Sequence, residues 1–340
     1  MRETGQALVL GDAMIPPLDK SSLITVFGGS GFVGRYVVRA LARRGFRIRA
    51  AVRRPDLAGH LQPMGAVGQI HAVQANVRFP ESVAAAVEGA DGVVNLVAIL
   101  AEGGEQTFDA IHVEGARAVA HAAHAAGAST LVHVSAIGAD PASQSAYART
   151  KAAGEAAILE EFSDAAIMRP SIIFGPEDEF FNRFAAMAQT SPVLPAVGGG
   201  RTRFQPVYVG DVAQAIAGVF DGRADAAATY ELGGPEVFTF RQLLERVNSY
   251  TGRNRRIVTL PYWLAKLQAF VTSPLPNALR PITLDQVRLL QTDNVVSEQA
   301  RETGHTLAAL GVTPPKAIET VVPAYLERFN PKGQYAHYRS

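Results

Sequence analysis

Three side chains that can hold or transfer a proton lie close together in the sequence: Ser135, Tyr147 and Lys151. Ser135 ends the apolar run TLVHVS, and a helix that we expect to begin near Ser145 carries Tyr147 and Lys151 in YARTK. Residues four apart share one face of a helix, so the sequence predicts the ammonium beside the phenol, where it lowers the pKa of Tyr147. Such a tyrosine can exchange a proton with a carbonyl or alcohol whose oxygen the serine holds. The alternative is that the pair is ordinary helix surface.

A glycine-spaced turn provides a second chemical feature. In ITVFGGSGFVGRYVVRAL, which starts at Ile24, a β-branched run leads into glycines three residues apart and continues as an amphipathic helix. This spacing suits a tight turn, a close approach of backbone to a pyrophosphate, and a helix N-terminus whose free N–H groups face the anion. The residues predicted to form this phosphate loop are Gly28, Ser30, Gly31, Phe32, Val33 and Gly34.

The charges after the second strand indicate which dinucleotide binds. A site for unphosphorylated NAD places an acidic side chain there, whereas this chain has Arg53 and Arg54. Arg35, directly after the last glycine, is predicted to point toward the same region. Guanidinium groups bind a 2′-phosphate that a carboxylate would repel, so the sequence favours NADP(H), with NAD(H) as the alternative. The bland interpretation of these arginines is solvated surface charge.

These features require a fold that alternates strands and helices. Short apolar runs and longer helical periodicities follow one another, which predicts a doubly wound parallel Rossmann sheet of the α/β class, with a smaller, mostly C-terminal α/β lobe. The predicted strands are 24–27, 47–52, 70–75, 92–98, 130–135 and 165–169. The predicted helices are 32–44, 81–88, 108–126, 146–161, 240–251, 262–271 and 284–292.

The chain divides into a large and a small unit. We expect an N-terminal tail over 1–21, a dinucleotide-binding Rossmann domain over 22–170, a smaller substrate or partner lobe over 171–330, and a C-terminal tail over 331–340. Residues 204–222 again predict a strand followed by a helix with Asp211 as N-cap, and we expect them to return and pack on the sheet.

Composition excludes several classes of function. The 340 residues are 48% hydrophobic and carry a net charge of +1, which argues against a nucleic-acid partner. The absence of cysteine excludes disulfides and thiolate metal sites, so redox chemistry would need an organic cofactor. His121 and His124 lack a third ligand nearby, so we predict no metal and exposed histidines. No signal peptide, transit peptide or membrane-spanning run is evident, which predicts a soluble or peripheral cytoplasmic protein.

The chain resembles the extended or atypical branch of the short-chain dehydrogenase/reductase superfamily from Ser22 to about Gly234. The resemblance implies that Ser135, Tyr147 and Lys151 occupy catalytic positions. It also assigns the remaining nucleotide contacts to Asn76, Val77, Leu96, Val97, Ala98 and Pro170, together with Tyr147 and Lys151. Two residues depart from the pattern: Asn76 stands where aspartate is usual, and Asn95 where the extended branch often has histidine.

Within that branch the chain is similar to the NADPH-binding accessory subunits of respiratory complex I, the NADH:quinone oxidoreductase. The strings GFVGRYVV, RPSIIFGPEDEFFNRFA, PVYVGDVA and GGPEVFTF carry this similarity. It implies a largely structural cofactor, complex I subunits as partners, and a place on the inner face of the plasma membrane, or on the matrix side in a eukaryote. The alternative is an active NAD(P)-dependent reductase, epimerase or isomerase, in which an arginine of RTRF at 201–204 holds a nucleotide-sugar diphosphate.

One more segment bears on partners. PYWLAKLQAFV over 261–271 predicts a helix with a broad apolar face beside Lys266. That face is suited to contact a partner or a membrane surface, with lobe core as the alternative. The polar residues after Pro331 are typical of a flexible extension.

Overall fold

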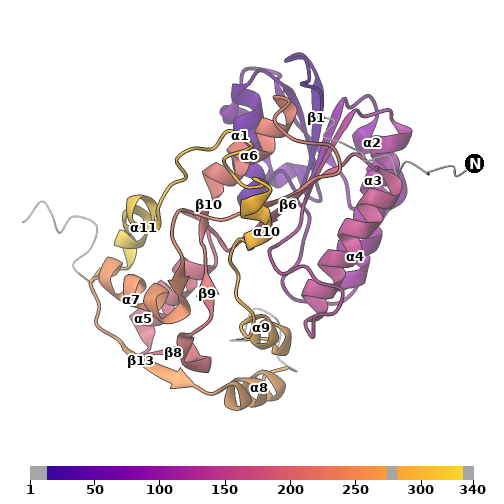
Figure 1. Cartoon of the computed structure of the whole chain (residues 1–340). Coiled ribbons are helices and arrows are strands. Elements are labelled where there is room, and N and C mark those ends of the chain that lie inside the picture. The colour runs from indigo at the N-terminus through magenta and orange to yellow at the C-terminus, as the bar shows by residue number, and fades with distance from the viewer. Residues whose placement is uncertain (1–13, 274–281, 332–340) are drawn as a thin grey trace, which may run out of the picture.

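The structure is a computed structural model that describes residues 14–273 and 282–331 (Figure 1). The predictions for the ends of both tails, and the proline-rich stretch 274–281, lie outside these ranges. At the start of the described chain, the Ile15 side chain is buried and its N–H donates to the carbonyl of Ala224. The residues just before the first strand therefore pack on the folded domain.

A seven-stranded parallel sheet forms the centre of the larger unit, which confirms the predicted doubly wound α/β class. Its strand order is β11-β6-β5-β4-β1-β2-β3. The strands are β1 (Leu23–Phe27), β2 (Arg47–Val52), β3 (Ile70–Gln74), β4 (Gly92–Asn95), β5 (Thr130–Val134), β6 (Ala166–Pro170) and β11 (Thr229–Leu232). Sequence analysis missed β11, which pairs with β6 although 58 residues separate Pro170 from its first residue.

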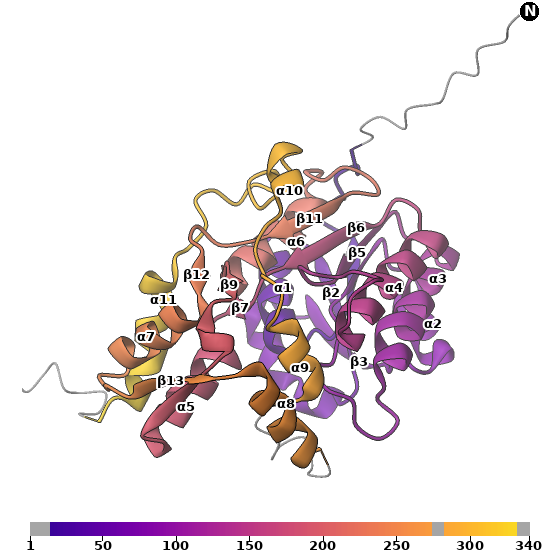
Figure 2. The ribbon, with the colours of Figure 1, turned by 60° about the horizontal axis from the view of Figure 1, so that its bottom comes forward.

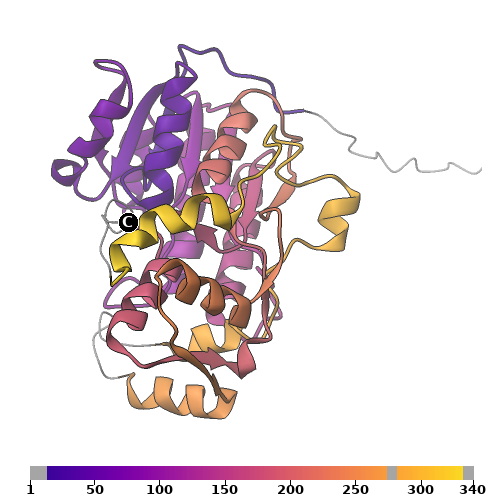
Figure 3. The ribbon, with the colours of Figure 1, turned by 90° about the vertical axis from the view of Figure 1, so that its left-hand side faces the viewer.

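Helices cover both faces of the sheet (Figures 1 and 3). One face packs against α1 (Phe32–Arg43) and α6 (Val209–Phe220), whose buried side chains form a core with β1 and β2. The other face packs against α2 (Pro80–Val87), a π-helical turn over Asp109–Glu114 that continues as α3 (Gly115–Ala125), and α4 (Ala146–Glu161). The central strands β1, β4, β5 and β6 are almost entirely buried, as expected for a covered parallel sheet, whereas the edge strand β3 is largely exposed or half-buried.

Of residues 204–222, which we expected to return to the sheet, α6 (Val209–Phe220) does so and lies beside α1, whereas Phe204 and residues 207–208 pair within the smaller lobe. The N-cap of α6 is Tyr208, so the prediction of Asp211 in that position is wrong. Asp211 lies in the first turn, where its carboxylate accepts a hydrogen bond of 2.6 Å from the backbone N–H of Lys316. A contact with a residue 105 positions away was not visible in the local sequence.

The smaller lobe packs around its own aromatic core. Its short strand pairs are β7 (Ile173–Phe174) with β10 (Val207–Tyr208), β9 (Arg203–Phe204) with β12 (Phe238–Thr239), and β8 (Val193–Val197) with β13 (Arg256–Leu260). Its helices are α5 (Phe180–Thr190), α7 (Phe240–Tyr250), α8 (Tyr262–Val271), α9 (Leu284–Leu289) and α11 (Ile318–Leu326). The short helix α10 (Glu298–Glu302) lies beside β11 of the large unit, where the Ser297 N–H donates to the Glu231 carboxylate. Figure 2 shows α5, β13 and α8 to one side of the sheet, with α9 next to α4.

Strand order reverses beside β1, because β2 and β4 flank it and their chain connections run to opposite sides. In parallel α/β sheets ligands bind beyond the carboxyl ends of the strands at such a point. Among the described residues, no helix is both long and apolar enough to cross a membrane.

Candidate dinucleotide site

A cavity of about 1480 Å³ opens at the carboxyl edge of the sheet and extends into the smaller lobe. The ends of β1, β2, β4 and β5 line one part of it, and α5, β8 and α9 line another. The strand ends of the large unit therefore line the part of the cavity where parallel α/β sheets bind ligands, and the smaller lobe lines the rest.

The glycine turn has no room for side chains. Gly28 has φ = +79°, and its carbonyl accepts a hydrogen bond of 3.0 Å from the N–H of Gly31. A Cβ on Gly34 would lie 2.1 Å from the Gly28 carbonyl oxygen and 2.7 Å from backbone atoms of Gly29. Glycine at position 34 is therefore required for α1 to pack directly on the turn, and this close packing sets the N-terminus of α1 at the cavity.

The N-terminus of α1 is available to an anion. Its N-cap is Gly31, which has no side chain to accept hydrogen bonds from the first-turn N–H groups, and no acidic residue occupies that turn. The positive end of the helix dipole thus faces the cavity that Gly31 and Phe32 line. This cradle fits the pyrophosphate of a dinucleotide.

Most of the predicted nucleotide residues line this one cavity. Those lining it are Gly28, Ser30, Gly31, Phe32, Val33, Gly34, Arg53, Asn76, Val77, Leu96, Val97, Ala98, Ser135, Tyr147 and Pro170. Arg35, Arg54 and Lys151 are not among its lining residues.

The prediction that Arg35, Arg53 and Arg54 converge on the cofactor site is wrong for Arg35 and Arg54. Arg35 forms an ion pair of 3.2 Å with Glu177, and Arg54 forms one of 2.8 Å with Asp56. Only Arg53 lines the cavity, where its guanidinium donates to the side-chain oxygen of Gln106 at 3.2 Å. Arg53 takes part in no ion pair within the described residues, so its charge is available to a ligand phosphate.

Arg78 also lines the cavity, beside Asn76, and sequence analysis missed it. Its guanidinium is paired with Glu105 at 2.8 Å. In the sequence, only its position two residues after Asn76 pointed to the site. In the structure, the Arg78 N–H donates to the side-chain oxygen of Asn76 at 3.2 Å.

Asn95 organises the end of β4 from within the core. Its side-chain oxygen accepts from the N–H of Val97 at 3.1 Å, and its amide nitrogen donates to Nδ1 of His133 at 3.2 Å. Burial lowers the pKa of His133, which keeps the ring neutral. The amide thereby fixes the backbone of Leu96 and Val97, two of the cavity-lining residues.

Ser135 lines the cavity, and its hydroxyl is buried without a partner. The residue is 5% exposed, follows the end of β5, and its Oγ has no hydrogen-bond partner in the protein. A buried polar group without a partner is costly, so this oxygen is suited to bind a polar atom of a ligand.

Lys151 supports the serine from behind. Its side chain is 1% exposed, and Nζ donates a hydrogen bond of 2.7 Å to the carbonyl of Val134, the residue before Ser135. Burial lowers the pKa of Lys151 to about 8, although Glu155 acts in the opposite direction. The Glu155 carboxylate accepts hydrogen bonds from Nε and one Nη of the Arg169 guanidinium, at 2.9 and 2.5 Å.

The expected lowering of the Tyr147 pKa is wrong. Burial raises the pKa of Tyr147 to about 12, so the phenol is protonated at neutral pH. Its ring packs edge-on against His112 and Phe108, at centroid distances of 5.4 and 6.0 Å. The four-residue spacing predicted that Lys151 shares a helix face with Tyr147. The ammonium instead binds the Val134 carbonyl, so the burial of the phenol determines its pKa.

His112 is held as a neutral ring beside Tyr147. Its Nε2 accepts from the N–H of Ile99 at 3.1 Å, so the proton lies on Nδ1 and is donated to the Thr150 hydroxyl at 3.0 Å. Burial lowers the pKa of His112 to about 3, with a further contribution from the Lys151 charge. The ring therefore serves as a wall for Tyr147.

Asp285 links the lobe to the helix that carries Tyr147, and sequence analysis missed it. Its carboxylate accepts from the Ser145 hydroxyl and the Ala146 N–H, both at 2.7 Å, and from the Tyr147 N–H at 3.1 Å. Ser145 is the N-cap of α4, as predicted. A carboxylate at a helix N-terminus is favourable, so α9 fixes the start of α4.

Neither arginine of the 201–204 segment lines the cavity, contrary to the diphosphate-binding interpretation. Arg203 is paired with Asp293 at 2.7 Å. From this segment only Phe204 contributes to the wall.

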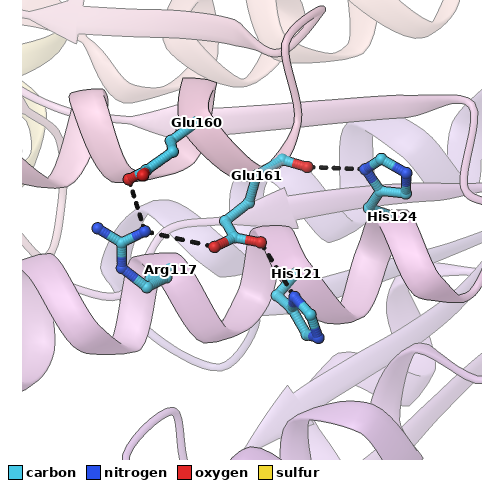
Figure 4. Close-up of polar contacts among 5 residues, drawn as sticks. All are labelled: Arg117, His121, His124, Glu160 and Glu161. Atoms are coloured by element: carbon cyan, nitrogen blue, oxygen red, sulfur yellow. Dashed lines mark hydrogen bonds and ion pairs between the residues drawn. The ribbon is translucent and has the colours of Figure 1, made fainter.

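His121 and His124 are exposed, as predicted, and they join α3 to α4 (Figure 4). Nδ1 of His121 lies 3.0 Å from the Glu161 carboxylate, and Nδ1 of His124 lies 2.8 Å from the Glu161 carbonyl. Arg117 contacts the same carboxylate at 3.3 Å. No cluster of three metal-ligating side chains occurs within residues 14–273 and 282–331.

Solved structures agree with this fold. One similar structure is the NADPH-dependent quinone oxidoreductase QOR2 of Escherichia coli with NADPH (TM-score 0.68, 22% identity, 88% of this chain and 98% of that one). Another is the dTDP-glucose 4,6-dehydratase DesIV of Streptomyces venezuelae with NAD and TYD (TM-score 0.67, 19% identity, 93% and 98%). At these identities the likeness shows the Rossmann fold alone.

Sequence relatives are more similar. The mitochondrial NADH dehydrogenase [ubiquinone] 1 alpha subcomplex subunit 9 of Arabidopsis thaliana is 38% identical over 81% of this chain and 71% of that protein. The mitochondrial NADH-ubiquinone oxidoreductase 40 kDa subunit of Neurospora crassa is 30% identical over 92% and 80%. A ceramide reductase of Caulobacter vibrioides is 29% identical over 72% and 75%. The predicted similarity to complex I accessory subunits is thereby confirmed.

A family profile also matches residues 24–233, from β1 through the end of β11, and so includes the glycine turn, Ser135 and Tyr147. With the sheet order and the glycine cradle described above, this match establishes that the chain belongs to the NAD dependent epimerase/dehydratase family.

Proposed function

We propose that this chain is an NADP(H)-binding accessory subunit of a respiratory NADH:quinone oxidoreductase. The observation that carries the proposal is the 38% identity over 81% of the chain to an alpha subcomplex subunit 9. The similarity continues through the smaller lobe, where partner or substrate specificity would be encoded, since the Neurospora crassa subunit aligns with 92% of the chain.

The residues present fit a dinucleotide. The Gly28–Gly34 turn and the N-terminus of α1 would hold the pyrophosphate, Asn76 and Val77 the adenine side, and Leu96 to Ala98 the ribose side. Arg53 would bind a 2′-phosphate, which supports NADP(H) over NAD(H). When bound, the nicotinamide can supply or accept a hydride.

The named relatives support a structural role for the cofactor, since those at 38% and 30% identity are subunits of a respiratory oxidoreductase. Burial raises the pKa of Tyr147 to about 12, so the phenol keeps its proton at neutral pH, which is compatible with a bound cofactor in either role. Lys151 holds the Val134 carbonyl. A cofactor that stays bound stabilises the folded state by mass action, by about 4 kcal/mol at a thousandfold excess over its dissociation constant.

We also propose that the α8 face contacts the membrane surface next to the complex. Trp263 and Phe270 are 68% and 72% exposed, so the lobe-core alternative is wrong for these side chains. Ala265 and Ala269, on the opposite side of α8, pack against Val287. The membrane surface in question would be the inner face of a bacterial plasma membrane, or the matrix side of the inner membrane in a eukaryote.

Extraction in mild detergent followed by size separation tests the assignment. Co-migration of this chain with NADH:quinone oxidoreductase activity, with stoichiometric NADPH that stays reduced, is the expected result. A chain that migrates alone and turns over NADPH with a small carbonyl substrate would contradict it.

A second candidate function is carbonyl reduction. The unpaired Ser135 hydroxyl in the cavity favours it, because it can hold a carbonyl oxygen to which the Tyr147 phenol donates its proton. The ceramide reductase of Caulobacter vibrioides is a relative with such an activity by name. Tyr147→Phe separates the two: the reductase would lose its activity, whereas the accessory subunit would leave assembly and respiration unchanged.

A further inference from the structure

The cavity extends into the smaller lobe, beyond the residues of the dinucleotide site. The whole cavity, with its dinucleotide part included, has a volume of about 1480 Å³, which exceeds the roughly 300–1,000 Å³ that is usual for one small-molecule pocket. The compartment beyond the dinucleotide residues therefore has room for a second ligand. The chemistry of its walls indicates which kind.

One wall is aromatic. Phe180 and Phe184 of α5 are half-buried and line the cavity, together with Phe204 and with Phe240 at the start of α7. The four rings form one cluster, with centroid distances between 5.1 and 6.3 Å. Met187 extends this wall by one turn along α5. Such a surface offers apolar contact and no hydrogen bonds.

Beyond the rings and Met187, the lining side chains of the lobe are aliphatic on β8 and β13 and mostly polar over residues 286–294. Pro195 and Val197 of β8, Leu260 at the end of β13, and Leu289 of α9 all line the cavity. Polar groups are present too: Arg183 is exposed, whereas Gln286 and Arg288 are half-buried. The wall made by α5, β8 and β13 is thus suited to remove hydrocarbon from water, which stabilises binding by about 25 cal/mol per Å² of apolar surface.

The polar end of this compartment is Ser135. Ser135 lines the same cavity, and its hydroxyl is buried without a partner, so a ligand oxygen that reaches this hydroxyl can satisfy it. We propose that the lobe compartment binds a compound with a long hydrocarbon chain and a carbonyl or hydroxyl head, with the chain on the Phe180–Phe184–Met187 wall and the head at Ser135. This ligand goes beyond the accessory-subunit function and does not depend on it.

A fluorescent long-chain fatty acid, cis-parinaric acid, tests the proposal on the full chain with NADPH added. We expect saturable fluorescence enhancement, weakened roughly tenfold by Phe184→Gln, because a polar amide in an apolar wall costs at least about one kilocalorie. Phe79→Gln is the matched control, since Phe79 is exposed and outside the cavity. Met187→Trp narrows the wall and should weaken a sixteen-carbon chain more than an eight-carbon chain, which keeps the test valid if Phe184→Gln unfolds.

Competition identifies the source of the chain. Displacement by hexadecan-2-one indicates an acyl compound, and displacement by geranylgeraniol indicates an isoprenoid; either supports the proposal. Absence of saturable enhancement, equal losses in Phe184→Gln and Phe79→Gln, or displacement by UDP-glucose would overturn it. Calorimetric titration of NADPH, run separately, reports on the cofactor, so loss of cofactor binding is distinguishable from loss of chain binding.

Discussion

The Lys151 ammonium donates a hydrogen bond of 2.7 Å to the carbonyl of Val134, directly before Ser135. This contact ties the middle of α4 to the end of β5, where Val134 and Ser135 both line the cavity, while Lys151 is buried behind them. Lys151 therefore acts as a positioning residue for the Ser135 hydroxyl. Its effect on the chain extends to stability, because its charge is buried.

Replacement of Lys151 by methionine should change how stability depends on pH. The folded pKa of about 8 lies below the ordinary value of 10.5, so between these values the unfolded chain binds more protons than the folded one. Stability of the natural chain then rises with pH in this window, relative to Lys151→Met, and the cost is constant below pH 8. Urea unfolding at pH 7, 8, 9 and 10 measures the difference; parallel curves for the two proteins would contradict it.

Gly34→Ala should abolish cofactor binding. The added Cβ would meet the Gly28 carbonyl oxygen at 2.1 Å, so α1 must move away from the turn. Overpacking of this kind costs about 1–3 kcal/mol of stability. Calorimetric titration with NADPH and thermal unfolding provide the measurements. Gly59→Ala is the control, because no atom lies within 4 Å of its added Cβ; similar losses in both variants would argue against the cradle.

Arg53→Ala should weaken NADPH binding more than NADH binding. Arg53 lines the cavity and forms no ion pair among the described residues, so its loss removes a contact to the 2′-phosphate alone. A charge-assisted hydrogen bond contributes about 1.5–3 kcal/mol, which predicts roughly a tenfold to hundredfold loss for NADPH. Arg54→Ala is the matched control, since Arg54 is paired with Asp56 outside the cavity. If both nucleotides lose affinity equally in Arg53→Ala, the assignment is wrong.

Asp285→Ala should destabilise the protein by about 1–2 kcal/mol, the usual cost of losing a helix cap. The carboxylate accepts three hydrogen bonds at the start of α4, including one from the Tyr147 N–H. Asp285→Asn keeps an acceptor oxygen and loses the charge. Its free energy of unfolding in urea should therefore lie between that of the natural chain and that of Asp285→Ala. An Asn variant no more stable than the Ala variant would show that charge alone matters.

Trp263→Ser together with Phe270→Ser should reduce sedimentation with vesicles of anionic phospholipid. Both side chains are mainly exposed on α8, and each removes apolar surface from water when it enters the interface. Phe79→Ser and Leu57→Ser, which are exposed elsewhere, form the matched control. Equal sedimentation of all variants would count against a membrane contact, and loss of co-migration with the oxidoreductase alone would indicate a protein partner.

Local patterns were sufficient for much of the fold. The strands β1 to β6 and the helices α1 and α4 follow from apolar periodicity and the glycine turn, because these elements depend on neighbours in the chain. The strand β11 was missed, since a four-residue strand inside a turn-rich region has no distinctive period. The site residues differ in the same way. Residues near the strand ends, such as Gly34 and Asn76, line the cavity as predicted, whereas not all of the long charged side chains do so.

The sequence by itself determined the turn, the sheet class and the absence of thiol chemistry, because these depend on residue type and near neighbours. The tertiary structure decided where charges are directed: Arg35 to Glu177, 142 residues away, and Asp285 to the start of α4. It also decided the pKa of Tyr147, since the burial that raises it is produced by packing against Phe108 and His112. Desolvation and ion pairing act through space, and a spacing rule along one helix does not contain them.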